Sequence, residues 1–236
     1  ANGVLQLFEN RQAGRFDPVV GPVLPDPVVA MAIGDLNADG RLEVATLTTG
    51  GQLWICRWGH EGWETTSVAE WAGFSREAVS GSYRLLLADF DNNGALDVLG
   101  SGPAGTQLWL ADERSQLVSS GLAVPAEIFG VAELTGDGLL DLLGVRNGEP
   151  LQLVGQGSAG YGWQRIRPRA HIAAGDQRIN AFGVGGEIEI RAGLLVQKQV
   201  LTGAPAHFGL GTYIQADVTR ISWPNGVTQA DFDFAV

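Results

Sequence analysis

The feature that most restricts the fold of this chain is a nine-residue acidic pattern that occurs three times. The segments DLNADGRLE, DFDNNGALD and ELTGDGLLD align without gaps at residues 35–43, 89–97 and 133–141. Each has an oxygen-bearing side chain at positions one, three, five and nine, and a glycine at position six. Because the starts lie 54 and then 44 residues apart, the spacing predicts a repeat in which each unit is one supersecondary element.

Each unit is predicted to be a four-stranded sheet, because its apolar runs are short and bounded by Gly, Asn and Asp. The 34 glycines of the chain suit many turns and few long helices. A helical turn is expected only at SREAV (75–79). The predicted strands are VVAMAIGDL, LEVATLT, GQLWICRW and WETTSVAEW in the first unit, YRLLLADF, LDVLGSG, TQLWLAD and QLVSSGLAV in the second, and IFGVAEL, LDLLGVR, PLQLVGQG and WQRIRPRA in the third.

Repeated small sheets of this size are typical of β-propeller blades. The segment GVLQLFENRQAGRFDPVV, ahead of the first unit, matches only the last two strands of a blade. The sequence therefore predicts an all-β chain, with a partial propeller of about three and a half four-stranded blades over residues 1–160. Propellers close with four to eight blades, so we expect neighbouring subunits, or further blades of a longer parent chain, to cover the open edges.

The charge distribution predicts a second domain, a small β domain over residues 161–236. Residues 1–160 hold 20 acids and 8 bases, whereas residues 161–236 hold 6 acids and 7 bases. The acidic excess argues against a nucleic-acid partner, whose phosphates would be repelled. No apolar run reaches the 18 residues of a membrane span, and the first ten residues lack the pattern of a signal peptide, so we expect a processed chain or a piece of a longer one.

The repeated acidic loop has the chemistry of a calcium site. Ca²⁺ takes six to eight oxygen ligands, and the alternating side chains can supply them around a turn that the glycine permits. The residue at position seven would contribute its backbone carbonyl. The predicted ligands are Asp35, Asn37, Asp39, Arg41 and Glu43 in the first loop, Asp89, Asp91, Asn93, Ala95 and Asp97 in the second, and Glu133, Thr135, Asp137, Leu139 and Asp141 in the third.

Up to three calcium ions are expected, and the third site is expected to be the weakest. Glu133 is a methylene longer than aspartate, and Thr135 offers only a hydroxyl. An EF-hand is excluded, because position twelve is Thr46, Gly100 and Gly144 in the three loops and the flanks are strands. Mg²⁺ is less favoured, since it keeps several waters. Three hairpin turns with solvated carboxylates are the alternative to a metal.

On these loops the chain resembles the FG-GAP or VCBS repeat of integrin-α-like β-propellers. After residue 160, the segments GEIEIRAG, HFGLG (207–211) and WPNG (223–226), together with Gly183 and Gly185, are similar to the ASPIC/UnbV domain of cartilage-acidic-protein-like proteins. The resemblance implies an extracellular or cell-surface location, with the periplasm as a further option. It also implies a calcium-binding module for adhesion, recognition or assembly, with a protein or glycan ligand.

No catalytic residue is predicted, and a non-enzymatic function is favoured. A polysaccharide-active hydrolase or lyase built on a propeller is the alternative, and it would need convergent acids outside the loops. GQGSAG (155–160) has dinucleotide-binding spacing, but a strand-like basic segment follows it, so we interpret it as a turn. His60, His171 and His207 are scattered, which argues against zinc, and His207 is interpreted as structural.

Several other side chains carry expectations about packing. Trp54, Trp58 and Trp109 lie in third strands, where we expect interblade core, and Cys56 is expected to be a buried thiol. Trp63 and Trp71 flank a more polar strand, where exposure for sugar stacking is the alternative to the favoured core position. The three arginines of the segment 165–169 alternate on one strand face. A solvated face is favoured for Arg165, Arg167 and Arg169 over pairing with the acidic propeller, and residues 171–236 are expected to dock on the last blade.

Overall fold

A computed structural model describes residues 4–11, 13–75, 82–157, 160–170 and 180–232 of the protein. Over these residues the fold is all-β, with strands in six sheets and no helix. The residues that the structure describes thus include no helix able to cross a membrane. The predicted helical turn at SREAV falls largely outside the described residues.

Two of the predicted four-stranded units form as expected, each as an antiparallel sheet in sequence order. The first sheet contains β3 (Val28–Gly34), β4 (Glu43–Thr48), β5 (Gln52–Trp58) and β6 (Trp63–Glu70). The second contains β7 (Arg84–Ala88), β8 (Asp97–Gly102), β9 (Gly105–Ala111) and β10 (Leu117–Val124). The third contains β11 (Glu127–Ala132), β12 (Asp141–Arg146) and β13 (Glu149–Leu153).

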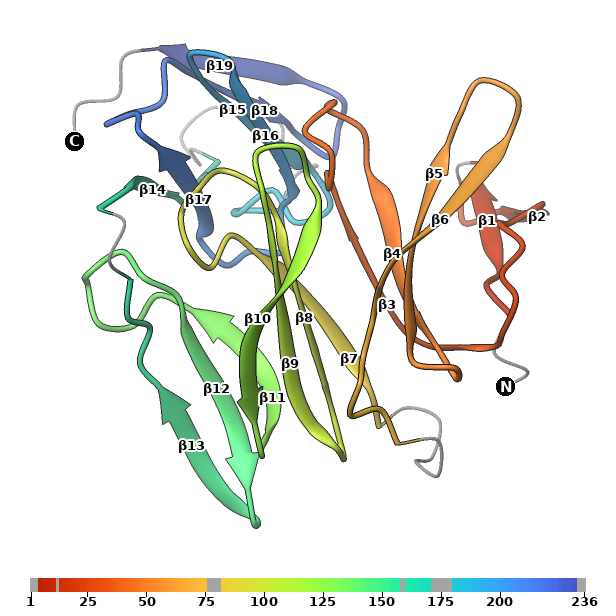
Figure 1. Ribbon diagram of the computed structural model, residues 1–236. Coiled ribbons are helices and arrows are strands. Elements are labelled where there is room, and N and C mark those ends of the chain that lie inside the picture. Colours follow the sequence, from red (N-terminus) through yellow and green to blue (C-terminus); the bar gives the residue numbers. More distant parts are fainter. Residues whose placement is uncertain (1–3, 12, 76–81, 158–159, 171–179, 233–236) are drawn as a thin grey trace.

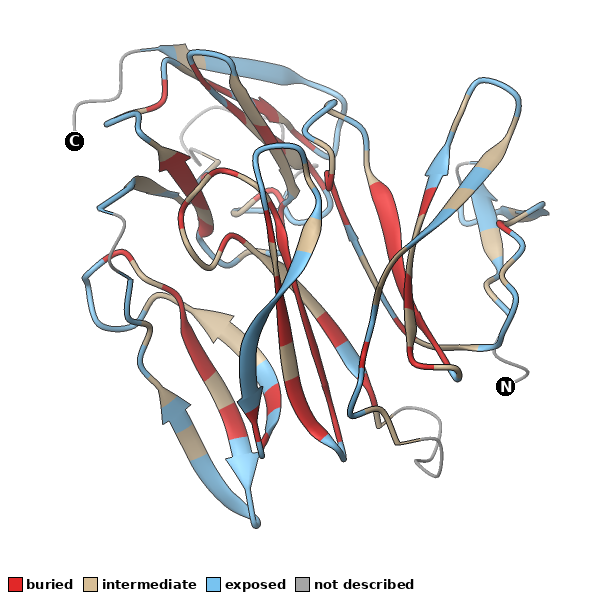
Figure 2. Cartoon of the chain, in the orientation of Figure 1, coloured by how far each residue is buried: buried red, intermediate tan, exposed pale blue. Residues whose placement is uncertain are grey.

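The three sheets fan out side by side, as blades of a partial propeller do (Figure 1). The first strand of each sheet lies innermost, since β3 contacts β7 and β7 contacts β11. The strands β4 and β8 are buried along their whole length, and they form the reddest parts of the fan in Figure 2. The prediction of a partial, propeller-like all-β fold is therefore confirmed.

The predicted half blade at the amino end is a separate hairpin of β1 (Leu7–Asn10) and β2 (Phe16–Val19). Its side chains Phe8 and Phe16 are 55% and 58% exposed. The Trp63 indole donates a hydrogen bond to the Val20 carbonyl at 2.9 Å, which ties the segment after the hairpin to the first sheet.

The third unit differs from its prediction, because it has three strands rather than four. The segment WQRIRPRA was predicted as its fourth strand, but β14 (Gly162–Ile166) pairs with β17 (Ala206–Gly211) instead. The physical reason is packing: Ile166 contacts the apolar cluster around Phe208.

The described residues from 160 to 232 form what we call the C-terminal module. It contains the β14–β17 pair and a four-stranded sheet in the order β16-β15-β18-β19. The strands of that sheet are β15 (Glu187–Ala192), β16 (Leu195–Val200), β18 (Val218–Ser222) and β19 (Thr228–Phe232). Its own core includes the fully buried Ile188, Ile190 and Phe208. In Figure 1 the module lies across the end of the fan where the loops after β3, β7 and β11 are found.

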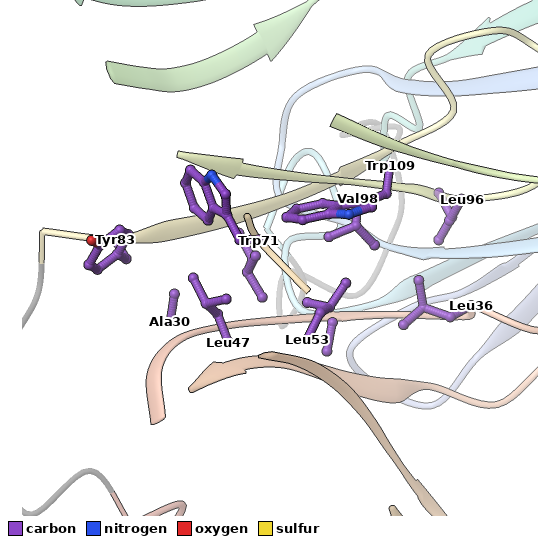
Figure 3. Packing of buried hydrophobic residues seen from close by; sticks show 11 residues of the cluster. Ala30, Leu36, Leu47, Leu53, Trp71, Tyr83, Leu96, Val98 and Trp109 are labelled. Atoms are coloured by element: carbon purple, nitrogen blue, oxygen red, sulfur yellow. The ribbon is translucent and has the colours of Figure 1, made fainter. Parts of the chain in front are cut away.

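The main core lies between the first and second sheets, where Trp71 packs edge-on against Trp109 with ring centroids 6.0 Å apart (Figure 3). Trp71 is 4% exposed and Trp109 is 2% exposed, so the core position expected for both is confirmed. Cys56 is fully buried, also as expected. The expectation for Trp58 was wrong: it is 60% exposed and packs against Trp63 at the end of the hairpin.

Replacing Trp71 by alanine should destabilise the protein by about 3–5 kcal/mol, because it opens a cavity between two sheets. Trp58→Ala is the matched control, since it removes the same ring from an exposed site of the first sheet. The control should cost under about 1 kcal/mol. Urea unfolding of the two variants measures the difference, and equal losses would contradict the assignment of Trp71 to the interblade core.

Candidate metal centre

The three acidic loops share one backbone arrangement, each lying between the first and second strands of its sheet. The ninth-position acid is buried in every loop, and its carboxylate accepts a hydrogen bond from the backbone N–H at position two. The donor and acceptor pairs are Leu36 N to Glu43 Oε2 at 2.8 Å, Phe90 N to Asp97 Oδ2 at 2.7 Å, and Leu134 N to Asp141 Oδ2 at 3.3 Å. The ninth acid therefore closes each loop, whether or not a metal binds.

The sharp turn predicted at position six is present in all three loops. Gly40, Gly94 and Gly138 have φ values of +82°, +97° and +82°, a backbone region that strains residues with a Cβ. Position four is also left-handed in all three loops, with φ of 57° at Ala38, 59° at Asn92 and 83° at Gly136. Asn92 and Gly136 are residue types that favour a positive φ, but Ala38 is not, so the three loops share no sequence signal for this second turn.

The second loop brings its carboxylates together. Asp89 and Asp97 are 1% and 0% exposed, and Asp91 is half-buried. One potential ligand atom from each of the three lies within 4.8 Å of the others, and in the described part of the chain no other such group of acids, histidines or cysteines occurs. Asp89 Oδ2 accepts from Gly94 N at 2.8 Å, whereas the buried Oδ1 has no hydrogen-bond partner. A buried carboxylate oxygen without a partner is costly, so this site fits a cation.

The electrostatics of the second loop agree with that geometry. Burial raises the pKa of Asp89 well above its ordinary value, and the nearby Asp97 carboxylate raises it further. Burial also raises the pKa of Asp97 to about 7, against the opposing effect of hydrogen bonds from Ala111 and Phe90. Ionisation of these carboxylates is thus costly in the metal-free protein, because burial and the neighbouring carboxylate both disfavour the charged form. A divalent cation would supply the positive charge that stabilises the ionised carboxylates.

Asn93, the remaining side-chain ligand predicted in the second loop, makes protein contacts. Its Oδ1 accepts from Ala95 N at 2.7 Å, and its Nδ2 donates to the Ala111 carbonyl at 2.7 Å and to Asp91 at 3.3 Å. Asn93 therefore ties the loop to β9 and holds Asp91 in place.

The first loop buries Asp35 and Glu43 but satisfies them from its own backbone. Asp35 accepts from the N–H groups of Asp39 and Gly40 at 3.1 and 3.0 Å. The Asn37 amide donates to Asp39 at 3.0 Å instead of leaving both side chains for a metal. Burial raises the pKa of Asp35 to about 6 and that of Glu43 to about 7, so these carboxylates also lack a full counter-charge.

The third loop is organised differently. Glu133, at position one, forms an ion pair with Arg165 of β14 at 2.8 Å, while Thr135 and Asp137 are exposed. The prediction that Arg165 lies on a solvated face was therefore wrong.

At position seven of the three loops, Arg41 is exposed, and Ala95 and Leu139 are half-buried.

Asn92 makes a set of contacts at the site that the sequence did not predict. It is buried at position four of the second loop, and its Nδ2 donates to the Gly138 carbonyl of the third loop at 2.9 Å. Its Oδ1 lies 2.8 Å from His207 Nε2, and its carbonyl accepts from Gly211 N at 2.8 Å. Because the amide group of Asn92 already donates to Gly138, His207 Nε2 is the donor in that contact. Asn92 thus joins two acidic loops to the C-terminal module.

We had expected the C-terminal module to dock on the last blade. The module contacts that blade, and it also contacts the acidic loops of the other two. Lys198 Nζ donates to the Gly40 carbonyl in the first loop at 3.2 Å. His207 contacts Asn92 in the second loop, and Arg165 pairs with Glu133 in the third. The segment HFGLG lies directly on the second loop, because a Cβ added to Gly209 would overlap the Asp89 carboxylate and the Asn92 backbone.

Comparison with known proteins supports the repeat. The FG-GAP-like repeat family matches residues 35–100, which include the first two acidic loops. This part of the chain is therefore an FG-GAP-like repeat β-structure. No curated protein matches the chain. A mutant of the Tc holotoxin pore from Photorhabdus luminescens is similar over 93% of this chain, with 13% identity and a TM-score of 0.30. The chain spans 11% of the length of that toxin chain.

The stability that the loop carboxylates contribute to the metal-free protein should fall as the pH rises from about 4 to about 7. The folded-state pKa values of Asp35, Glu43 and Asp97 are about 6, 7 and 7, against ordinary values of 3.8, 4.5 and 3.8. Between these limits the folded protein binds more protons than the unfolded chain, so their contribution is complete below pH 4 and is lost by pH 7.

Melting of the parent and Asp97→Asn in chelator, at pH 5 and pH 8, isolates this effect. The variant removes the titrating group, so the destabilisation that it causes should be smaller at pH 8 than at pH 5. His207 is common to both proteins and acts in the opposite direction, because burial lowers its pKa to about 4. A destabilisation that is the same at both pH values would show that the pKa of Asp97 is not raised in the folded protein.

Proposed function

We propose that the chain is a calcium-binding, propeller-like module whose principal site is the second acidic loop. The observation that carries this proposal is the buried Asp89 Oδ1, which lacks a protein partner within a convergent group of three carboxylates. Asp89, Asp91 and Asp97 would hold the ion, since Ca²⁺ prefers carboxylate oxygens and tolerates irregular geometry. The first loop is a second, weaker candidate, because Asp35 and Glu43 are buried but already accept backbone hydrogen bonds.

The ion would have a structural role. Its charge would offset the repulsion among carboxylates that the fold buries next to one another. The site lies beneath the C-terminal module, where Gly209 approaches Asp89, so a neutralised second loop also favours the contact between module and propeller. A ligand that binds only the folded state stabilises it by mass action.

We infer that this calcium-stabilised scaffold serves in adhesion, recognition or assembly and not in catalysis. Support comes from the site itself: within the described residues, the one convergent acidic group belongs to the loop that the ion would neutralise. An extracellular or cell-surface location suits sites of moderate affinity, since extracellular modules bind calcium at 10⁻⁴–10⁻³ M. The C-terminal module is proposed to be ASPIC/UnbV-like, on the segments GEIEIRAG, HFGLG and WPNG.

A neighbouring polypeptide is the proposed partner. The β1–β2 hairpin exposes Phe8 and Phe16, and in the described part of the chain the third sheet ends at the edge strand β13 without a fourth strand. Exposed sheet edges of this kind are normally covered. Incubation with a panel of polysaccharides separates this function from a hydrolase or lyase: the proposal predicts that no product forms, and released oligosaccharide would contradict it.

Calcium should raise the melting temperature of the parent chain, by an amount equivalent to about 2.7 kcal/mol at a hundredfold excess over the dissociation constant. Asp91→Ala should lose most of this gain, because it removes one of the three convergent carboxylates. Asp137→Ala and Glu113→Gln, which neutralise exposed acids outside that group, should retain it.

Thermal melting with calcium and with chelator measures these shifts. A parent chain that melts at the same temperature under both conditions would disprove the structural role. A larger loss from Asp137→Ala than from Asp91→Ala would place the principal site in the third loop instead.

A further inference from the structure

The third acidic loop differs from the second in what its first acid binds. In the second loop, Asp89 keeps a buried oxygen without a protein partner. In the third loop, Glu133 Oε1 accepts from the backbone N–H of Gly136, and Oε2 accepts from Arg165 Nη1 at 2.8 Å. The Glu133 side chain is 2% exposed and the Arg165 side chain is 48% exposed. A guanidinium that reaches in from the surface therefore neutralises a buried carboxylate.

The other acids of the third loop do not assemble a ligand set. The backbone N–H of Leu139 and the Thr135 side chain hold the pKa of the exposed Asp137 below its ordinary value. Asp141 accepts from Gly155 N at 2.9 Å and from Leu134 N at 3.3 Å. All nine residues of this loop are described, and they contain no group of converging carboxylates like that of the second loop. The residues present do not fit a calcium ion.

The structure also positions Arg165 for this contact. Arg165 lies on β14, which pairs with β17 of the C-terminal module, opposite His207. Two residues earlier on the same strand, the Trp163 indole covers Gly138, where an added Cβ would overlap the ring. Trp163 stacks on His207 with ring centroids 5.8 Å apart and planes 16° apart. Arg165 thus lies on a strand whose residue Trp163 already contacts the third loop at Gly138 and stacks on His207, which contacts the second loop.

We propose that the third acidic loop serves as a docking contact for the C-terminal module and not as a calcium site, with Arg165 supplying the positive charge that Glu133 requires. The repeat pattern predicts three calcium ions, and this arrangement reduces the number to two at most. The number of ions rests on the proposed calcium-binding function. The docking contact does not, because it depends only on residues of this chain.

Hydrogen exchange of the β14 amides tests the docking contact. Arg165→Gln should speed their exchange by about tenfold, because it leaves a buried carboxylate without its partner. Adding Glu133→Gln to that variant should restore much of the protection, since no buried charge then remains. Arg169→Gln, an exposed arginine of the same segment, is the control and should change little. Equal exchange in Arg165→Gln and Arg169→Gln would overturn the proposal.

Counting bound Ca²⁺ by native mass spectrometry tests the assignment of the loop. The parent should bind no more than two ions, Glu133→Gln should bind the same number, and Asp89→Asn should bind one fewer. A third ion in the parent that is lost in Glu133→Gln would overturn the proposal. If no ion binds at all, the proposed calcium function fails, and the exchange measurement alone then decides whether the third loop docks the module.

Discussion

The carboxylate buried at the ninth position of each acidic loop is the interaction on which the rest of the structure depends. It accepts the backbone N–H at position two, and in the second and third loops it also accepts an N–H at the end of the third strand or just beyond it, from Ala111 and Gly155. Without it, buried N–H groups would lose their acceptors, at a cost of about 1–3 kcal/mol each. The same acid therefore fixes the loop and brings a negative charge into the core.

The buried ninth acid adds its negative charge to that of the acid at position one. The three loops stabilise the acid at position one in different ways. In the first, the backbone N–H groups of Asp39 and Gly40 hold Asp35. In the second, Asp89 retains a buried oxygen without a protein partner. In the third, Arg165 arrives from the C-terminal module. One sequence pattern thus produces a loop whose own backbone satisfies its buried acids, a candidate metal site and a docking site. The difference lies in what packs above each loop.

The sequence predicted those parts of the structure that depend on local chemistry. The nine-residue spacing and its glycine located the loops, and apolar runs located most strands. It did not predict where β14 pairs, because Trp163 and Ile166 suit either sheet and only the packed module decides between them. It also did not predict the role of Asn92 or Arg165. Their partners, His207 and Glu133, lie 115 and 32 residues away, and no periodicity joins them.

The calcium anomalous signal from crystals of the protein grown with calcium would show whether the second loop holds an ion. We expect a peak within coordination distance of Asp89, Asp91 and Asp97, and none between Glu133 and Arg165. A water or an empty position among the three aspartates, with the second loop unchanged in chelator, would contradict it. A peak bound to Glu133 would contradict the assignment of the third loop to docking.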